Sequence, residues 1–413
     1  MQHRVEQLTT LLEISRHIGA ILDLKTLLTH IDLAARQVLE CERVTVFLYD
    51  AEREELYSTF ATGTEEIRFS SKEGLAGEAL QTGTTINIPD AYADPRFNPA
   101  IDQDTGFRTR NLLSVPMQGY EGEVVAVLQL INKHGGEFTT EDEELASTLG
   151  SLTGVAVQRQ MLLDAYAVKQ KIERDLAVAR DIQRSLLPNA DPQIEGFDIA
   201  GWNKSADETG GDVYDFILLP DGRLGILLAD ASGHGIGPAL VAAECRAMIR
   251  ALFTTTENLN TILTQTNAIL NQDLISGRFI TVFLGILDPG TGTIEYVSGG
   301  HAPLLYYSQA SGEERTMDAT TLPLGILSSI DGTPAEPLVM QRGDVLILVT
   351  DGFNEWKNLS EEEFGTDRIF AVVRQGQDRS ATEIIKAMHE EVVTYAEGIV
   401  QDDDLTAILI KKV

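Results

Sequence analysis

Residues 224–239 read LGILLADASGHGIGPA and largely decide the fold of the C-terminal half of the chain. An apolar run stops at Asp230, a glycine-rich turn follows it, and a segment of helix-forming residues begins at Pro238. This order predicts a strand, a tight turn and a helix, with a carboxylate at the end of the strand. A strand end holds a side chain rigidly, and glycines let an ion or ligand approach the backbone closely. Asp230 is therefore the first candidate site residue.

Acidic residues recur at other predicted strand ends in the same half of the chain. Asp212 precedes an apolar run, Asp351 follows one, and the triple-aspartate run 402–404 precedes the last strand. Each aspartate alone would more commonly be a turn or helix-cap residue. Together, without a histidine or cysteine cluster, they form a set of hard oxygen ligands that suits Mg²⁺ or Mn²⁺ and not Zn²⁺. Two such ions can direct a hydroxide at phosphorus, whereas the chain has neither a P-loop nor a Gly-x-Ser-x-Gly elbow.

The composition predicts a two-domain chain. With 413 residues, it is longer than one ordinary domain. It carries 32 basic and 63 acidic residues, a formal net charge of −31, which argues against nucleic-acid partners and anionic membranes. Two cysteines far apart in the sequence offer no disulfide framework, and no apolar run approaches the roughly 18 residues that span a bilayer. We therefore expect a soluble cytoplasmic protein.

Residues 189–413 resemble the PPM family of metal-dependent serine/threonine phosphatases, in its SpoIIE/RsbU branch. The segment ARDIQRSLLP at 179–188 is typical of the chain just before that domain. The resemblance implies an α-β-β-α sandwich that binds two or more Mn²⁺ or Mg²⁺ ions. It implies catalytic roles for Asp212 and Asp230, which are also metal ligands, with Asp230 bridging the ions. The further ligands that it implies are the Ala231 carbonyl, Asp351 and Asp403, with Asp404 as the alternative to Asp403.

Three basic side chains near these motifs are candidates for functional roles. His234 is a candidate general acid, but it stands farther from Asp230 in sequence than the equivalent histidine of eukaryotic relatives. Arg278 and His301 lie in a loop and in a glycine-rich turn, and we expect both to be structural. The arginine that clamps phosphate in eukaryotic relatives has no clear counterpart.

The N-terminal half shows an α+β pattern from residue 24 to about residue 160. An irregular segment at 82–111 is rich in Gly, Pro, Asp and Thr, and a loop of this length inside a domain is usually functional. The expected elements are helices at 27–39 and from Glu141 onwards, and strands at 44–49, 56–61, 113–116 and 124–131.

Four short motifs in this half resemble those of GAF domains, specifically the cyclic-nucleotide-binding kind. They are GLAG at 74–77, NIPDAY at 87–92, DQDTGFRTRN at 102–111 and the complete NKFDE pattern, Asn132-Lys133, Phe138 and Asp142-Glu143. The resemblance implies an ion pair between Lys133 and Asp142 that fixes the lid of the site. A GAF domain that binds no ligand and only dimerises is the alternative. The nucleotide would be cAMP or cGMP, with a lean to cAMP, and its contacts would be Thr45, Leu75, Ala76, Asp102, Thr105 and Thr109.

A long helix is predicted from residue 157 to residue 187, where Pro188 ends it. Its apolar residues recur at spacings of three and four, close to a heptad seam, which favours a parallel dimer helix over a helix buried within one chain. Residues 5–22 predict a second amphipathic helix, which either packs on the next domain or contacts another copy.

These features predict an N-terminal helix (1–23), a GAF sensor domain (24–156), a linker and dimerisation helix (157–188) and a PPM-type phosphatase domain (189–413). The expected function is removal of phosphate from a phosphoprotein, by resemblance an anti-sigma-factor antagonist. The expected enzyme is a homodimer whose GAF domain senses a small ligand. The alternative is a non-catalytic scaffold, against which the intact acidic ligands argue.

Overall fold

The computed structural model describes residues 23–58, 67–99, 102, 106–274 and 277–413. The helix expected at 5–22 lies outside the described residues. The chain divides into two compact units, Met1–Lys171 and Ile172–Val413. Within the described ranges, no helix is both long enough and apolar enough to cross a membrane.

The N-terminal unit is built on one antiparallel six-stranded sheet with the strand order β3-β2-β1-β6-β5-β4. Its strands are β1 (Cys41–Asp50), β2 (Glu55–Ser58), β3 (Ile67–Ser70), β4 (Ile86–Ile88), β5 (Leu112–Gln118) and β6 (Val124–Lys133). Its helices are α2 (Leu24–Leu39), α3 (Gly74–Thr82), the short 3-10 helix η1 (Ala91–Ala93) and the first part of α5 (Thr140–Leu186).

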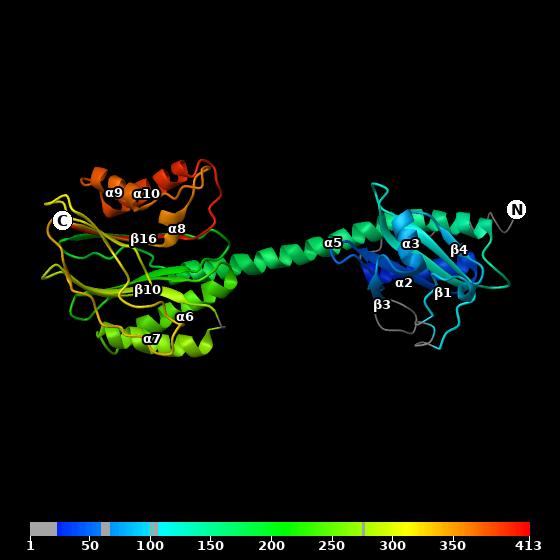
Figure 1. Ribbon diagram of the computed structural model, residues 1–413, viewed down its shortest axis with the longest axis horizontal. Coiled ribbons are helices and arrows are strands. Elements are labelled where there is room, and N and C mark those ends of the chain that lie inside the picture. The colour runs from blue at the N-terminus through cyan, green and yellow to red at the C-terminus, as the bar shows by residue number, and fades with distance from the viewer. Residues whose placement is uncertain (1–22, 59–66, 100–101, 103–105, 275–276) are drawn as a thin grey trace. The chain divides into compact units, whose positions relative to one another are not determined.

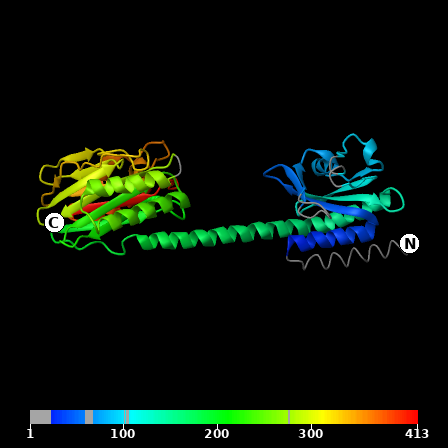
Figure 2. The same ribbon diagram turned by 90° about the horizontal axis from the view of Figure 1, so that it is seen from below.

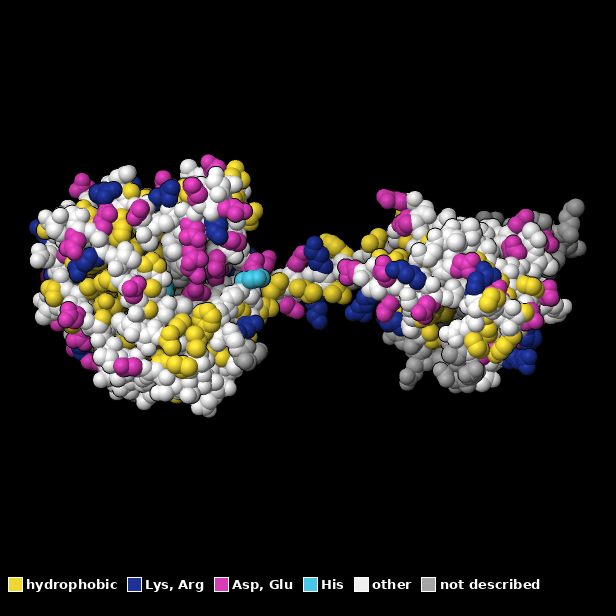
Figure 3. All heavy atoms as spheres, in the orientation of Figure 1, with side chains coloured by type: hydrophobic (Ala, Val, Ile, Leu, Met, Phe, Trp, Pro, Cys, Tyr) yellow, Lys and Arg dark blue, Asp and Glu magenta, His cyan; other side chains and the backbone are white. Residues whose placement is uncertain are grey.

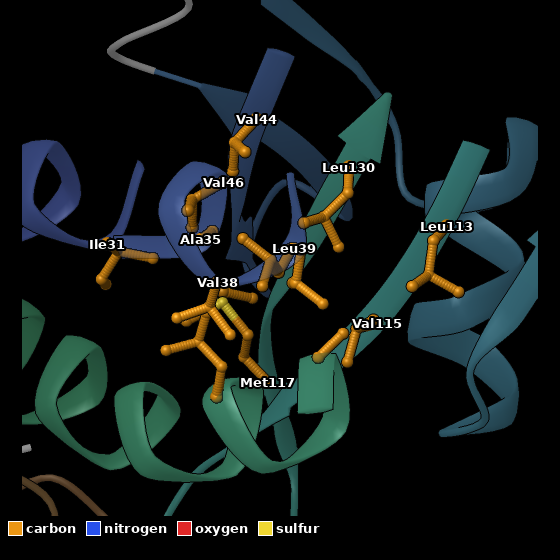
Figure 4. Packing of buried hydrophobic residues seen from close by; sticks show 14 of the residues in the cluster. Ile31, Ala35, Val38, Leu39, Val44, Val46, Leu113, Val115, Met117 and Leu130 are labelled. Atoms are coloured by element: carbon orange, nitrogen blue, oxygen red, sulfur yellow. The ribbon is translucent and has the colours of Figure 1, made fainter. Parts of the chain in front are cut away.

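Helices α2 and α5 lie side by side over one face of this sheet (Figure 2). Ile31 of α2 and Val46 of β1 belong to the core beneath them, which Figure 4 shows from close by. The opposite face of the sheet packs against α3, because Phe47 alternates with Val46 and joins Ala76 in a second apolar cluster. The unit is therefore a sheet with helices on both faces. The apolar core under α2 and α5 contains more buried residues than the cluster under α3.

Helix α5 continues without a break through the position where the linker helix was expected to begin. The helix predicted from Glu141 onwards and the helix predicted over 157–187 are thus one helix, which starts at Thr140. Its heptad pattern starts only near residue 157, because small residues before that point, Gly150 and Gly154, fit against the sheet. A Cβ on Gly154 would lie 2.2 Å from the carbonyl oxygen of Gln118 in β5, so only glycine permits this approach. Glycine is a weak helix former, and close packing on β5 offsets that weakness.

The C-terminal unit contains two five-stranded antiparallel sheets, ordered β14-β11-β10-β9-β8 and β13-β12-β15-β16-β7. The first sheet comprises β8 (Asp212–Leu218), β9 (Leu224–Ala231), β10 (Ile280–Asp288), β11 (Thr293–Gly299) and β14 (Leu338–Val339). The second comprises β7 (Phe197–Lys204), β12 (Leu304–Tyr307), β13 (Glu314–Met317), β15 (Val345–Val349) and β16 (Leu405–Lys412). The helices are α6 (Ile236–Leu252), α7 (Leu259–Asp273), α8 (Asp351–Glu355), α9 (Thr366–Gln375) and α10 (Ala381–Tyr395).

Four layers result, and Figure 1 shows them in order within this unit: α9 and α10, the sheet with β16, the sheet with β10, and α6 with α7. Apolar residues from both sheets, such as Leu228 and Ile408, fill the space between the sheets. Separate clusters lie between each sheet and its helices. This arrangement confirms the predicted α-β-β-α sandwich.

Candidate active site

The predicted aspartates come from the facing ends of the two sheets in the C-terminal unit. Asp212 opens β8 and stands directly opposite Asp230, near the end of β9, so their side chains share one face of the first sheet. Asp351 begins α8 immediately after β15, and Asp403 lies just before β16 in the second sheet. Figure 3 shows a band of acidic side chains on the face of this unit near the position that α8 has in Figure 1.

The electrostatics indicate that these carboxylates are close to one another. Burial, and then the charges of Asp351 and Asp403, raise the pKa of Asp230 above its ordinary value. Burial, and then the charge of Asp230, also raise the pKa of Asp212 well above its ordinary value. The pKa of Asp403 is raised to about 6, first by burial and next by Asp351. Each effect disfavours the charged form, so the cluster is one that a cation would stabilise.

Two threonine hydroxyls hold Asp212 in place. The Oγ1 atoms of Thr350 and Thr406 donate to Asp212 Oδ2 at 2.7 and 2.5 Å. All three side chains are buried, and the two hydrogen bonds fix the carboxylate through one of its oxygens. Neither threonine was among the site residues predicted from the sequence. Their position beside acidic motifs, one residue before Asp351 and three after Asp403, was the signal that could have revealed them.

The structure separates the roles of the two neighbouring aspartates that the sequence left as alternatives. Asp404 is buried, and its Oδ1 and Oδ2 accept from the backbone N–H groups of Ala206 and Asp212 at 2.8 and 3.2 Å. A Cβ on Gly210 would lie 2.2 Å from Asp404 Oδ2, so this loop wraps tightly around that carboxylate. Asp403 is more exposed, and its Oδ1 accepts a hydrogen bond from the adjacent backbone N–H of Asp404 at 2.8 Å. These contacts favour Asp403 as the ligand and Asp404 as the anchor of the loop.

The chemistry of the donor set fits Mg²⁺ or Mn²⁺. Carboxylates lie on both sides of Asp230, and the Ala231 carbonyl faces Gly211, where a Cβ would be 2.6 Å from its oxygen. In the described part of the chain, no group of three or more His, Cys, Asp or Glu side chains has a geometry that could hold a metal ion. Mg²⁺ usually keeps several waters and binds one or two carboxylates, so a site for it does not require such a group. Asp212, Asp230, Asp351 and Asp403 are the side chains that could hold the ions.

The three basic candidates occupy different surroundings. His234 has a ring that is 80% exposed, and its Nδ1 lies 3.1 Å from Asp207 Oδ2. Arg278 packs against the start of α6, where a Cβ on Gly237 would be 2.4 Å from its guanidinium. His301 is buried between the two sheets.

A cavity of about 220 Å³ opens in the N-terminal unit between β1, β6 and α3. Leu75 and Ala76, two of the predicted contacts, line it together with Phe47 and Gln129. Thr45 is buried and stands directly opposite Gln129, so both share that face of the sheet. The cavity therefore has an apolar wall, the side-chain amides of Asn98 and Gln129, and the first turn of a helix.

Two of the other predicted contacts, Asp102 and Thr109, do not line this cavity and instead hydrogen-bond to each other. Thr109 donates to Asp102 through its backbone N–H at 2.6 Å and its hydroxyl at 2.8 Å, and the Tyr92 hydroxyl donates to the same carboxylate. Asp102 thus ties together the long segment between β4 and β5. Thr105 is not among the described residues.

The NKFDE residues gather where α5 begins. Lys133 Nζ lies 2.8 Å from Asp142 Oδ1 and also donates to the Leu39 carbonyl at the end of α2. The Asn87 amide donates to Glu143 Oε1 in the first turn of α5. These contacts join β6, α2 and β4 to the start of α5.

Comparison with known proteins assigns both units. The GAF domain model matches residues 23–157, and the model of Stage II sporulation protein E (SpoIIE) matches residues 220–413. The chain carries a GAF domain followed by a SpoIIE-type PPM phosphatase domain. It is 26% identical over 261 residues to phosphoserine phosphatase RsbU of Bacillus subtilis (strain 168), a match that covers 63% of this chain and 76% of that protein.

Two further relatives are informative. The probable 3',5'-cyclic phosphodiesterase pde-5 of Caenorhabditis elegans is 30% identical over 169 residues, which cover 37% of this chain and 23% of that protein. The SiaA-PP2C domain of Pseudomonas aeruginosa has the same fold, with a TM-score of 0.52 at 22% identity, over 60% of this chain and 99% of that domain. The match to the SpoIIE model and the similarity to RsbU assign the phosphatase domain to the protein serine/threonine type.

The end of α5 contacts the phosphatase domain beside the first acidic strand. Gln183 Nε2 donates to the Gly210 carbonyl at 2.5 Å, and the Gly210 N–H donates back to Gln183 Oε1 at 3.0 Å. Arg180 Nε donates to the Glu208 carbonyl at 3.0 Å. Asp404 holds the 206–212 loop from one side and Gln183 holds it from the other.

Proposed function

We propose that this protein removes phosphate from serine or threonine residues of a phosphoprotein in a metal-dependent reaction controlled by a small ligand of its GAF domain. The observation that carries the proposal is the cluster of mutually destabilised carboxylates at the facing ends of the two sheets. Similarity to RsbU, a phosphoserine phosphatase, supports the substrate class. By the same resemblance, the substrate would be an anti-sigma-factor antagonist.

Each carboxylate has a role in this proposal. Asp212 and Asp230 would hold two cations from the first sheet, with Asp230 between them, and Asp351 and Asp403 would complete the set from the second. Bound Mn²⁺ or Mg²⁺ supplies an activated water and stabilises charge on the leaving oxygen. Thr350 keeps Asp212 oriented, and the buried setting strengthens every interaction with the phosphate.

The decisive test of the catalytic proposal is Mn²⁺-dependent hydrolysis of a phosphoserine peptide. We expect Asp230→Asn to lower kcat/KM by at least about 100-fold, the scale typical for loss of a main electrostatic contributor. Asp378→Asn, an exposed aspartate away from the cluster, is the matched control and should leave the rate unchanged. Unchanged Mn²⁺-dependent hydrolysis by Asp230→Asn would refute the proposal.

We infer that the GAF ligand is a cyclic nucleotide. The apolar wall suits a base, the Gln129 amide offers hydrogen bonds to its edge, and N–H groups at the start of α3 suit an anionic phosphate. Similarity to a probable cyclic phosphodiesterase supports this class of ligand. Calorimetry with cAMP and with cGMP tests it, and Gln129→Leu should weaken binding of the preferred nucleotide. No heat with either nucleotide would exclude both.

Helix α5 is the proposed route of control and the proposed dimer contact. Val168, Ile172 and Ile182 of the heptad seam are 60%, 54% and 59% exposed in the single chain, which suits a partner helix. Sedimentation would test this, since Ile172→Glu should yield monomers whereas Asp175→Lys, outside the seam, should not. An Ile172→Glu variant that stays dimeric would rule out this interface.

A further inference from the structure

His301 is a buried histidine for which the proposed mechanism has no use. It follows β11 in the segment Gly299-Gly300-His301-Ala302-Pro303 and is 3% exposed. Its Nδ1 lies 3.4 Å from Thr281 Oγ1 on β10. Burial lowers its pKa to about 4, opposed weakly by the Val349 backbone, so the ring is neutral at pH 7.

Thr281 connects this histidine to the acidic cluster. It stands directly opposite Asp230 on the neighbouring strand, so its hydroxyl and that carboxylate lie on the same face of the sheet. A hydroxyl has one proton to donate, and it can give that proton either to Asp230 or to a ring nitrogen. The contact that the described residues provide for this hydroxyl is His301 Nδ1.

It matters whether the Thr281 hydroxyl donates its proton to Asp230 or to His301, because Asp212 and Asp230 have different roles in the proposed cation site. Asp212 receives both of its threonine hydroxyls on one oxygen, Oδ2. In the proposed site, Asp230 would use both of its oxygens to hold two cations. A third hydroxyl proton directed at Asp230 would compete with a cation for one of them.

We propose that His301 is a positioning residue that accepts the Thr281 hydroxyl proton at Nδ1 and so keeps both Asp230 oxygens free for divalent cations. The ring then carries its own proton on Nε2, and Thr281 presents only lone pairs toward Asp230. The inference rests on the proposed function, because it assumes that Asp230 binds cations.

The test is Mn²⁺ titration calorimetry on the full chain and three variants. His301→Leu removes the acceptor and should weaken Mn²⁺ binding by about tenfold, the scale of a hydrogen bond to a charged group. His301→Gln keeps an acceptor oxygen and should bind Mn²⁺ nearly as the parent does. The double variant His301→Leu/Thr281→Val has no hydroxyl to misdirect and should recover most of the lost affinity.

A purely structural histidine predicts a different pattern, in which the second substitution adds damage and the double variant binds Mn²⁺ no more tightly than His301→Leu. That result, or unchanged affinity in His301→Leu, overturns the proposal. If the parent chain binds no Mn²⁺ and matches Asp230→Asn, the proposed function itself fails. Thermal unfolding in chelator shows whether each variant folds.

A measurement on the unmodified protein covers the case in which His301→Leu does not fold. The ¹⁵N chemical shifts of the imidazole distinguish the two tautomers, and His301→Gln identifies the signal among the seven histidines. A protonated Nε2 with a bare Nδ1 is expected. A proton on Nδ1 would contradict the proposal.

Discussion

Replacing Asp230 by Asn should stabilise the phosphatase domain when no metal is bound. In the folded domain, Asp230 is partly buried beside Asp212, Asp351 and Asp403, and its pKa is raised. An acid whose pKa is higher in the folded than in the unfolded state binds more protons when folded. The free energy of unfolding therefore falls as pH rises through the window between the two values, here from about 4 to about 7. Asparagine keeps the shape of the side chain and removes the charge.

The expected size follows from the repulsion that is relieved. If the neighbouring carboxylates together regain about one pKa unit, the gain above pH 7 is about 1.4 kcal/mol. For a domain of this size, that corresponds to a rise in Tm of about 3–6 °C. Near pH 4.5, where wild-type Asp230 is largely protonated, the two proteins should unfold at the same temperature.

Tryptophan fluorescence is a suitable probe because both tryptophans of the chain, Trp202 and Trp356, belong to this domain. Melts in chelator at pH 8 and pH 4.5 give the difference, with Asp378→Asn as the control. With Mn²⁺ at about 100 times its Kd, the wild type should instead unfold at the higher temperature, because metal binding adds about 2.7 kcal/mol to its free energy of unfolding. If the difference in Tm between Asp230→Asn and the wild type in chelator does not depend on pH, the charge-repulsion argument is refuted.

Three further substitutions test other contacts. Gly154→Ala places a methyl group 2.2 Å from a carbonyl oxygen of β5 and should destabilise the GAF domain by about 1–3 kcal/mol in chemical unfolding, whereas Ser151→Ala on the exposed side should not. Thr406→Val removes a hydroxyl from Asp212 and should weaken Mn²⁺ binding at least tenfold in calorimetry, with little change in the far-UV spectrum. Gln183→Ala removes two hydrogen bonds from the 206–212 loop and should raise the Mn²⁺ concentration for half-maximal activity several-fold; an unchanged value would contradict the role of this contact.

The sequence was sufficient for those parts of the fold and site that depend on local pattern. The apolar run into Asp230 predicted β9 and the turn after it, and the sheet register then brought Asp212 opposite. The α-β-β-α order followed from resemblance. These features could be predicted because strand ends and turns leave a signal within a few residues.

The remaining features depend on which strands become neighbours, and that information is not local. Thr350 and Thr406 reach Asp212 across more than a hundred residues of chain, so their role appears only when the sheets face one another. The distinct contacts of Asp403 and Asp404 depend likewise on the position of the distant 206–212 loop. The sequence predicted a helix from Glu141 onwards and a second one over 157–187, but not that they form one helix, because Gly154 between them is a weak helix former whose close contact with β5 exists only in the folded domain.

The contacts around the 206–212 loop indicate where control by the GAF domain would act. Asp404 and Gln183 hold this loop from two sides, and Asp212 is its last residue. A displacement of the end of α5 would therefore alter the spacing between Asp212 and Asp230, on which their repulsion and their affinity for cations depend.

If a GAF ligand changes Mn²⁺ affinity by some factor, thermodynamic linkage requires Mn²⁺ to change the affinity for that ligand by the same factor. We expect calorimetry of the nucleotide with and without saturating Mn²⁺ to give a ratio equal to that of the reverse titration, and Gln183→Ala to bring both ratios close to one. Equal nucleotide affinities in the presence and absence of Mn²⁺, in an enzyme whose turnover nevertheless responds to the nucleotide, would show that control acts on a later step than metal binding.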